Sequence, residues 1–198
     1  MNHLLTTIVH SPVLHAKWLN TLSFLENCGA RKIAACEHPT CVKEEVLKHA
    51  AEEFRHAHYL KRQIERVSAL PMDDYSLPFL LGGIATWHYL PLLDLHTSRY
   101  LKTIDKSLHF LKEASYLLVT YAIELRAQEL YPVYDRILRE IGSKVTVKSI
   151  LLEENEHLEE MKVGLKKIPS GFAHAEKICA LETELYNDWL KAISCEVK

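Results

Sequence analysis

The sequence has few of the residues that end helices or build turns. Its 198 residues include only six glycines and seven prolines, and no segment is low in complexity. This scarcity favours helices joined by short connections. No run of about 18 apolar residues is present, so the sequence predicts no membrane-spanning helix.

Cysteine is also scarce, and its pattern excludes two kinds of site. The five cysteines are Cys28, Cys36, Cys41, Cys179 and Cys195. Their number is odd and no pair has Cys-x-x-Cys spacing, which argues against a disulfide framework or a thiolate zinc site. The first residues, Met-Asn-His-Leu-Leu-Thr-Thr, lack the basic region and unbroken apolar run of a signal peptide. The sequence therefore predicts a cytoplasmic protein.

An excess of one charge is absent as well. The formal net charge is −2 with histidine neutral, so no broad basic field predicts a nucleic acid or an anionic membrane as partner. The hydrophobic fraction of 48% and the charged fraction of 25% are ordinary for a globular protein. The length predicts a single domain, residues 1–198, with room for a sizeable core.

Hydrophobic periodicity predicts an all-α chain. Ser11-Pro12 has the form of a helix start, a capping residue followed by proline at the first helical position. We expect four bundle helices at about 12–35, 42–67, 104–141 and 145–165, and an additional C-terminal helix at about 172–193. Residues 1–11 are expected to be a lead-in.

The stretch between the second and third expected helices is the least regular. Pro71, Pro78, Gly82, Gly83 and Pro91 interrupt its pattern. Residues 77–100 are nevertheless rich in apolar and aromatic side chains, so we expect them to be packed and partly helical. A connection of this length can carry the chain from one end of a bundle to the other.

One short motif occurs twice. Residues 52–56 read Glu-Glu-Phe-Arg-His and residues 153–157 read Glu-Glu-Asn-Glu-His, 101 positions later. Residues three apart on a helix lie about 60° apart around its axis and roughly one turn apart along it. Glu53 and His56 can therefore face one point, and Glu154 and His157 can do the same.

Two further acids lie on apolar helix faces. Glu26 adjoins the inner face of the first expected helix, and Glu124 is the only acid in the apolar segment 116–125. A carboxylate on an apolar face is costly unless it is paired, protonated or bound to a metal. Ion pairs are the alternative, for Glu26 with Arg31 or Lys32 and for Glu124 with Arg126 or Arg136. The two motif copies could also belong to solvated helix faces, and Glu129 is the rival to Glu124.

Together these residues form a ligand set for two metal ions. The expected ligands are Glu26, Glu53, His56, Glu124, Glu154 and His157. Four carboxylates would balance the charge of two divalent ions, and mixed imidazole and carboxylate ligands with open positions suit iron or manganese better than a closed zinc site. We expect Glu26, Glu53 and His56 chiefly on one ion, the other three on the second, and two bridging glutamates.

The order of these ligands resembles that of the ferritin-like di-iron carboxylate proteins. In that family two helices give one Glu each and two give Glu-x-x-His. The resemblance covers about residues 12–165. It implies a four-helix bundle with one long crossover and a cofactor of two iron ions, with manganese or a mixed manganese–iron pair as alternatives.

The first motif copy also resembles the acid-Glu-x-Arg-His element of the bacterial multicomponent monooxygenases and ribonucleotide reductase relatives. There the acid before the ligand orients a histidine, so the resemblance implies that role for Glu52 and Glu153. The second copy departs from the element, because Glu156 occupies the position of the arginine.

Two other residues are candidates for a place beside the ligands. His49 lies seven residues before His56 and could be an extra ligand or a gate, with a hydrogen-bonded core histidine as the alternative. Tyr121 lies one turn before Glu124 and could donate a hydrogen bond or electrons, with packing as the alternative.

These observations predict a protein that activates dioxygen to oxidise a small organic substrate. An electron donor and a homodimeric partner are left open, and neither a nucleic acid nor a membrane is expected. Two alternatives remain. A ferroxidase or iron-handling protein of the ferritin or rubrerythrin kind would need no organic pocket, and a metal-free helical interaction protein would leave four inner carboxylates unexplained.

Overall fold

A computed structural model describes residues 1–38, 40–105 and 107–197, and for residues 108 and 109 the backbone alone. The described residues form seven α-helices and two short 3-10 helices, with no strand among them. The predicted all-α class is thereby confirmed. Within the described residues no helix combines the length and the apolar character needed to cross a membrane.

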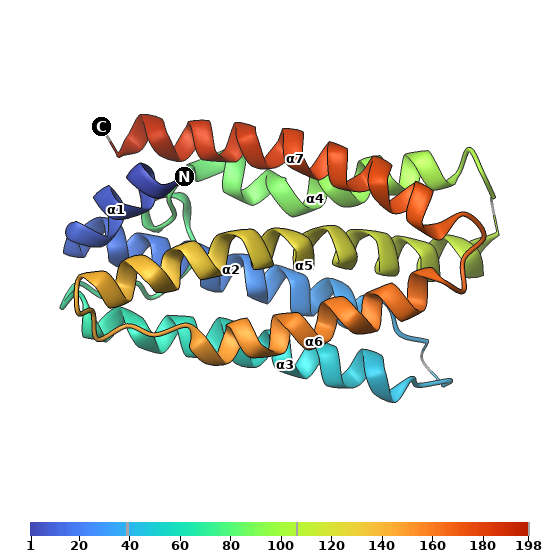
Figure 1. Cartoon of the computed structure of the whole chain (residues 1–198), viewed down its shortest axis with the longest axis horizontal. Coiled ribbons are helices and arrows are strands. Elements are labelled where there is room, and N and C mark those ends of the chain that lie inside the picture. Colours follow the sequence, from blue (N-terminus) through green and yellow to red (C-terminus); the bar gives the residue numbers. More distant parts are fainter. Residues whose placement is uncertain (39, 106, 198) are drawn as a thin grey trace.

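The four helices expected to form the bundle are present; the first extends one residue further than expected, and the other three are shorter. They are α2 (Pro12–Cys36), α3 (Glu44–Gln63), α5 (Leu108–Glu140) and α6 (Lys148–Leu165). The predicted start of α2 is correct, because the Ser11 hydroxyl accepts the amide of Leu14 at 3.4 Å and Pro12 takes the first helical position. Helix α2 packs along α3, and α5 packs along α6 (Figure 1).

Three more helices surround these four. Helix α1 (Asn2–His10) covers one end, α4 (Gly83–Leu101) follows the 3-10 helices η1 (Ile64–Arg66) and η2 (Leu77–Phe79), and α7 (Gly171–Glu196) ends the chain. The expectation of a lead-in at residues 1–11 is wrong, because Leu5, Ile8 and Val9 recur at helical spacing and are buried. The structure thus adds α1 to the predicted helices, and α4 with η2 confirms that residues 77–100 are packed and partly helical.

The long connection does carry the chain across the molecule. Figure 1 shows α3 ending near the end of the molecule where α4 begins, and α4 running to the opposite end, where α5 starts. Pro91 and Pro132 lie inside α4 and α5 without dividing either helix. Pro91 lies on the exposed face, where water can satisfy the carbonyl that loses its partner.

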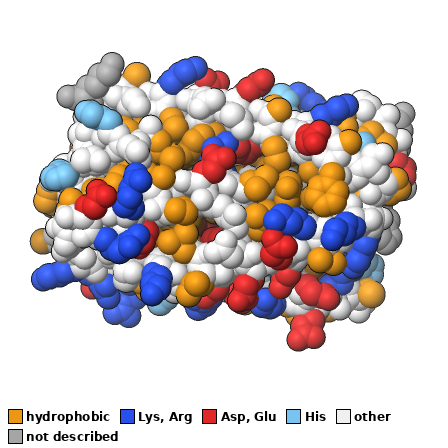
Figure 2. All heavy atoms as spheres, in the orientation of Figure 1, with side chains coloured by type: hydrophobic (Ala, Val, Ile, Leu, Met, Phe, Trp, Pro, Cys, Tyr) orange, Lys and Arg blue, Asp and Glu red, His pale blue; other side chains and the backbone are white. Residues whose placement is uncertain are grey.

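Aromatic packing joins α7 to the layer beneath it. Trp189 stacks on Trp18 of α2 and on Tyr89 of α4, each at 5.7 Å between ring centroids. Helices α4 and α7 lie side by side above α2 and α5, and α3 and α6 lie below them (Figure 1). Charged side chains of both signs crowd the lower part of the molecule's face, over α3 and α6 (Figure 2). The core and the candidate site lie between these layers.

Candidate metal centre

The two motif copies face each other from α3 and α6. Glu53, His56, Glu154 and His157 are each no more than 5% exposed, although both helices carry many charged residues. The alternative that the motifs lie on solvated faces is therefore wrong. The histidine of each motif copy contacts the first glutamate of the other copy across the two helices.

The two single glutamates approach from α2 and α5. Glu124 is 3% exposed, and Glu26 is half-buried beside it at the wall of a cavity. Within the part of the chain that the structure describes, neither makes the ion pair that was the alternative to metal binding, and Lys32 and Arg126 pair with other acids. Glu26 accepts a short hydrogen bond from the hydroxyl of Tyr131. Arg126 binds Glu182 and the exposed Glu129, which also removes Glu129 as a rival ligand.

The carboxylates and imidazoles form two overlapping groups. One group contains Glu26, Glu53, His56 and Glu154, and the other contains His49, Glu53, Glu124 and His157. The ligand atoms of each group lie within 4.8 Å of one another, close enough to surround an ion. Glu53 belongs to both. All six predicted ligands are brought together, and His49 joins them.

The grouping differs from the expected division in one respect. Glu154 lies with the first group, where its Oε1 is 3.1 Å from Nδ1 of His56, rather than only with Glu124 and His157. Its other oxygen is 3.6 Å from Nδ1 of His157. Glu154 and Glu53 thus each face both groups, which is the geometry of bridging carboxylates.

Among the described residues, several inward-facing atoms make no hydrogen bond of good geometry, although oppositely charged atoms lie only 3.1 Å and 3.3 Å from the two ring nitrogens among them. They are Oε1 of Glu53, Oε2 of Glu124 and the Nδ1 atoms of His56 and His157, all fully buried among the described residues. Buried polar atoms in native proteins are nearly always satisfied. A cation between them would satisfy both the carboxylate oxygens and the imidazole nitrogens, so this donor set fits a pair of divalent ions.

The outer ring nitrogens of both motif histidines bind acids from the opposite helix. His56 Nε2 lies 2.8 Å from Oε2 of Glu153, and His157 Nε2 lies 2.9 Å from Oε2 of Glu52. Each ring therefore donates outward and directs Nδ1 toward the cluster. This is the geometry that the expected orienting role of Glu52 and Glu153 requires. Each acid binds the histidine of the other motif copy.

The arginine of the first motif also acts across the helices. Arg55 makes a short ion pair with Glu153, the acid that binds His56. Burial raises the pKa of Glu153, but Arg55 and His56 outweigh it and hold this pKa below the usual value. Lys48 lies 4.0 Å from Glu52. Both orienting carboxylates thus have a cation beside them, although the second motif lacks the arginine.

His49 is fully enclosed by the cluster. Its Nε2 lies 3.2 Å from Oε1 of Glu124 and 3.4 Å from Oε1 of Glu53. Its Nδ1 lies 3.0 Å from the hydroxyl of Tyr116, and its ring centroid is 4.1 Å from that of His157. The tyrosine fixes the ring so that Nε2 points at the carboxylates.

Tyr121 packs away from the ligands, which is the alternative that the sequence left open for it. The half-buried side chain packs in the cluster that contains Leu117, and its electrostatic neighbours are Cys179, Lys162 and Glu159. Tyr131 lies seven residues after Glu124, within about 20° of it around α5, and its hydroxyl donates to Glu26.

The buried charges of the cluster shift the pKa values of its members. Burial raises the pKa of Glu26 and of Glu124 well above the usual value, and neighbouring carboxylates raise it further. Burial lowers the pKa of His56 and His157, but Glu154 and Glu53 outweigh this and raise them to about 11 and about 10. All four shifts favour binding of positive charge among the carboxylates, whether as protons or as divalent ions.

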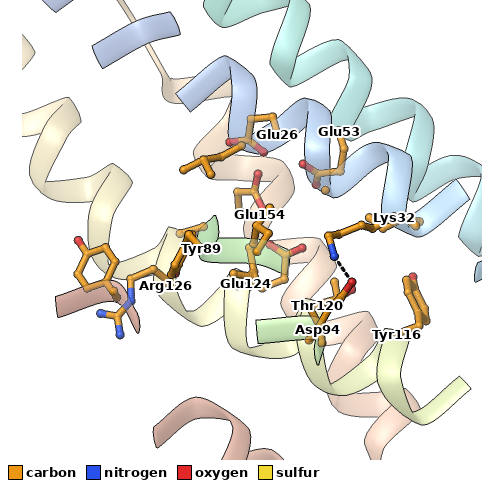
Figure 3. A pocket seen from close by; sticks show the side chains of 18 of the residues that line it. Glu26, Lys32, Glu53, Tyr89, Asp94, Tyr116, Thr120, Glu124, Arg126 and Glu154 are labelled. Atoms are coloured by element: carbon orange, nitrogen blue, oxygen red, sulfur yellow. Dashed lines mark hydrogen bonds and ion pairs between the residues drawn. The ribbon is translucent and has the colours of Figure 1, made fainter. Parts of the chain in front are cut away.

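A cavity of about 280 Å³ ends at the carboxylates. Figure 3 shows Glu26, Glu53, Glu124 and Glu154 directed toward one another at this point, from four different helices. Half-exposed side chains, among them Lys32 and its ion-pair partner Asp94, also line the cavity, so it reaches the surface between α2 and α4. The candidate metal centre therefore lies at the inner end of a cavity that opens to the surface.

Comparisons with other proteins do not indicate a family for this chain. No protein-family model, curated protein or solved structure matches the chain. The arrangement of the described residues is a buried carboxylate and histidine cluster that could bind metal, with a cavity beside it.

Proposed function

We propose that the chain is a di-iron carboxylate protein of the ferritin-like kind that activates dioxygen to oxidise a small organic substrate. The observation that carries this proposal is the cavity of about 280 Å³ ending at the four clustered glutamates. Iron oxidation alone requires no organic pocket. The cavity therefore favours an oxidase or oxygenase over a ferroxidase.

The order of the ligands along the chain supports the ferritin-like assignment. Helices α2, α3, α5 and α6 contribute Glu, Glu-x-x-His, Glu and Glu-x-x-His in turn, and α4 forms the long crossover between the halves. This is the ligand set of the di-iron carboxylate bundles. A chance pair of Glu-x-x-His motifs would not bring six such side chains within reach of two ions.

Each ion would have four candidate ligand residues. Glu26, Glu53, His56 and Glu154 would hold one, and His49, Glu53, Glu124 and His157 would hold the other. Iron suits this mixture of carboxylate and imidazole, and manganese or a mixed pair is the alternative. Glu53 would bridge, and Glu154 is placed to do so.

The chain's own residues would prepare the site for oxidation chemistry. Iron ions held by these ligands would supply the electrons for dioxygen reduction, with an external electron donor to reduce the ions again. Glu52 and Glu153 would hold the two imidazoles in the orientation that binds metal. The mostly apolar cavity wall would limit water and hold the substrate near the ions.

Anaerobic iron loading followed by exposure to oxygen tests the proposal. We expect two ferrous ions per chain, and an absorption change when oxygen is admitted. Glu53→Ala and Glu154→Ala should abolish binding of the pair, because each faces both metal positions. Glu129→Ala is the matched control, since this side chain on α5 is 64% exposed.

Two results would overturn the assignment. Binding of less than one ion per chain, with a melting temperature unchanged by iron, would remove the metal centre altogether. Rapid iron oxidation with ferric product released, and no oxidation of any organic molecule bound in the cavity, would favour the ferroxidase alternative.

A further inference from the structure

The wall of the cavity is mostly hydrocarbon. Apart from the four clustered glutamates, its lining consists largely of aliphatic and aromatic side chains from α2, α4, α5 and α7, including Leu22, Leu25, Leu90, Val119, Leu130 and Trp189. Binding of an apolar molecule in such a cavity would be favourable, because its apolar surface would be removed from water.

The other charges in the lining already have partners. Lys32 pairs with Asp94 across the rim (Figure 3), and Arg126 makes two hydrogen bonds to the buried carboxylate of Glu182. Among the described lining residues no other cation is present. Away from the four glutamates, a charged group of a ligand would have to break one of these pairs or remain unpaired in a largely apolar space, which is costly. The wall therefore selects uncharged molecules.

The volume limits the size of the occupant. A cavity of 150 Å³ lined by apolar side chains is enough to hold benzene. The cavity here, about 280 Å³, therefore suits a molecule of about ten non-hydrogen atoms, such as a fused pair of rings.

One residue of the wall is a glycine at a position where the backbone conformation would accept a larger residue. Gly29 lies within α2, one turn after Glu26, and has no positive φ that would call for glycine. A Cβ added there would meet nothing within 4 Å. Glycine within a helix is less stable than alanine, so neither helix formation nor packing accounts for it. Its place in the lining leaves open space directly beside a candidate ligand.

We infer that the cavity binds a small, uncharged, largely apolar organic molecule of about bicyclic size, and that Gly29 keeps open the part of the cavity next to Glu26. Identifying this molecule as the substrate rests on the function proposed above. The binding itself depends only on the shape and chemistry of the wall.

Indole is a suitable probe, because it is uncharged, bicyclic and soluble. We expect metal-free protein to bind indole in a calorimetric titration with a dissociation constant below about 1 mM, the order of affinity reached by small apolar ligands of high efficiency. Gly29→Leu should weaken binding at least ten-fold by filling the space. Ala127→Phe, which enters the cavity from α5, should do the same.

Ala34→Leu provides the matched control, because Ala34 is an exposed residue of the same helix and does not line the cavity. It should bind indole as the unaltered protein does. Circular dichroism and melting temperature would establish that each variant is folded. If one cavity variant fails to fold, the other still tests the wall.

Two outcomes would overturn the inference. They are an absence of indole binding by the unaltered protein, and unchanged affinity in folded Gly29→Leu or Ala127→Phe protein. Indole binding that is blocked by these variants, in a protein that takes up no iron, would support the inference while removing the proposed oxidation. The two proposals can therefore fail separately.

Discussion

Seven side chains at the candidate centre come from four helices, and six of them could be predicted from residue spacing. The prediction was possible because two residues of a Glu-x-x-His motif share one helix face. The role of His49 could not be predicted in this way, because spacing fixes only the helix face on which a residue lies. A seven-residue step from His56 fixes its face but not whether it reaches the carboxylates, and only the packed helices place its Nε2 near Glu124 and Glu53.

Replacing His49 should affect one metal position more than the other. The His49→Ala protein would lose a donor from the group with Glu124 and His157, while the group with His56 keeps all of its own. Anaerobic titration with Co²⁺, followed by visible absorption, should show the stoichiometry falling from two ions to one. Tyr116→Phe is the control, since it removes only the partner of the outer nitrogen. Two ions with unaltered spectra in His49→Ala would make this histidine a structural residue.

The partners of the motif histidines could not be assigned from sequence. The motif places an acid before each ligand, but it does not specify which histidine that acid meets. The answer depends on the relative rotation and register of α3 and α6, and the structure pairs Glu153 with His56 and Glu52 with His157. Orientation of each imidazole is therefore shared between two distant segments.

Because Glu153 binds the histidine of the other motif copy, replacing it should weaken metal binding at His56. Glu153→Ala would free the ring of His56, and loss of such an orienting partner typically lowers metal affinity about 10- to 100-fold. Competition with a chromophoric chelator would measure the change. Glu156→Ala, an exposed acid in the same motif, should leave affinity within about two-fold, since surface charges have small effects. Equal losses in both variants would mean that general charge, and not orientation, is responsible.

At the scale of whole elements, α4 was the hardest to predict. Glycine and proline at its start and Pro91 within it indicate breaks when read locally. Gly82 adopts φ +76° before the helix, and a Cβ there would lie 2.9 Å from Oγ1 of Thr86. Trp189 of α7 then donates to that same hydroxyl at 2.8 Å. Contacts from another part of the chain thus stabilise a helix that local signals interrupt.

A buried ion pair joins three elements beside the cavity. Glu182 on α7 accepts hydrogen bonds from Arg126 on α5 and from Tyr89 on α4, and is only 2% exposed. Glu182→Ala would leave the guanidinium of Arg126, whose side chain is 14% exposed, without its main partner. Removing one member of a buried pair typically costs about 3–5 kcal/mol.

Urea denaturation of the metal-free proteins would measure this loss. Glu184→Ala, an exposed acid two residues along the same helix, should change the free energy of unfolding by no more than about 0.5 kcal/mol. A loss below about 1 kcal/mol in Glu182→Ala, with an unchanged denaturant slope, would contradict the view that this pair holds α4, α5 and α7 together.

At the scale of the molecule, sequence spacing predicted the helix order and the crossover but not the cavity. A cavity depends on the volumes left between α2, α4, α5 and α7, and these follow from packing contacts far apart in the chain. Gly29 shows the difficulty. A glycine within a helical pattern can be a simple cost to stability, and only the surrounding helices reveal the open space beside it.

The whole fold should be linked to pH and to metal through the same cluster. Burial opposes charge on His56 and His157, yet the facing carboxylates raise their pKa values from 6.5 to about 11 and about 10. In the metal-free protein this stabilisation is fully present below about pH 6.5 and is lost as the pH rises through about 10 to 11. Bound divalent ions must instead displace these protons, and the raised pKa values of Glu26 and Glu124 oppose metal binding in the same direction.

Metal should therefore stabilise the protein more as the pH rises from 6 to 8. An ion at 100 times its dissociation constant adds about 2.7 kcal/mol to the free energy of unfolding. Because binding releases more than one proton, affinity should fall about ten-fold or more for each unit of acidification. Melting temperatures with and without Mn²⁺, which avoids oxidation during heating, would measure the difference at each pH. A difference independent of pH would mean that the bound ion does not displace these protons, and so does not lie among these carboxylates and imidazoles.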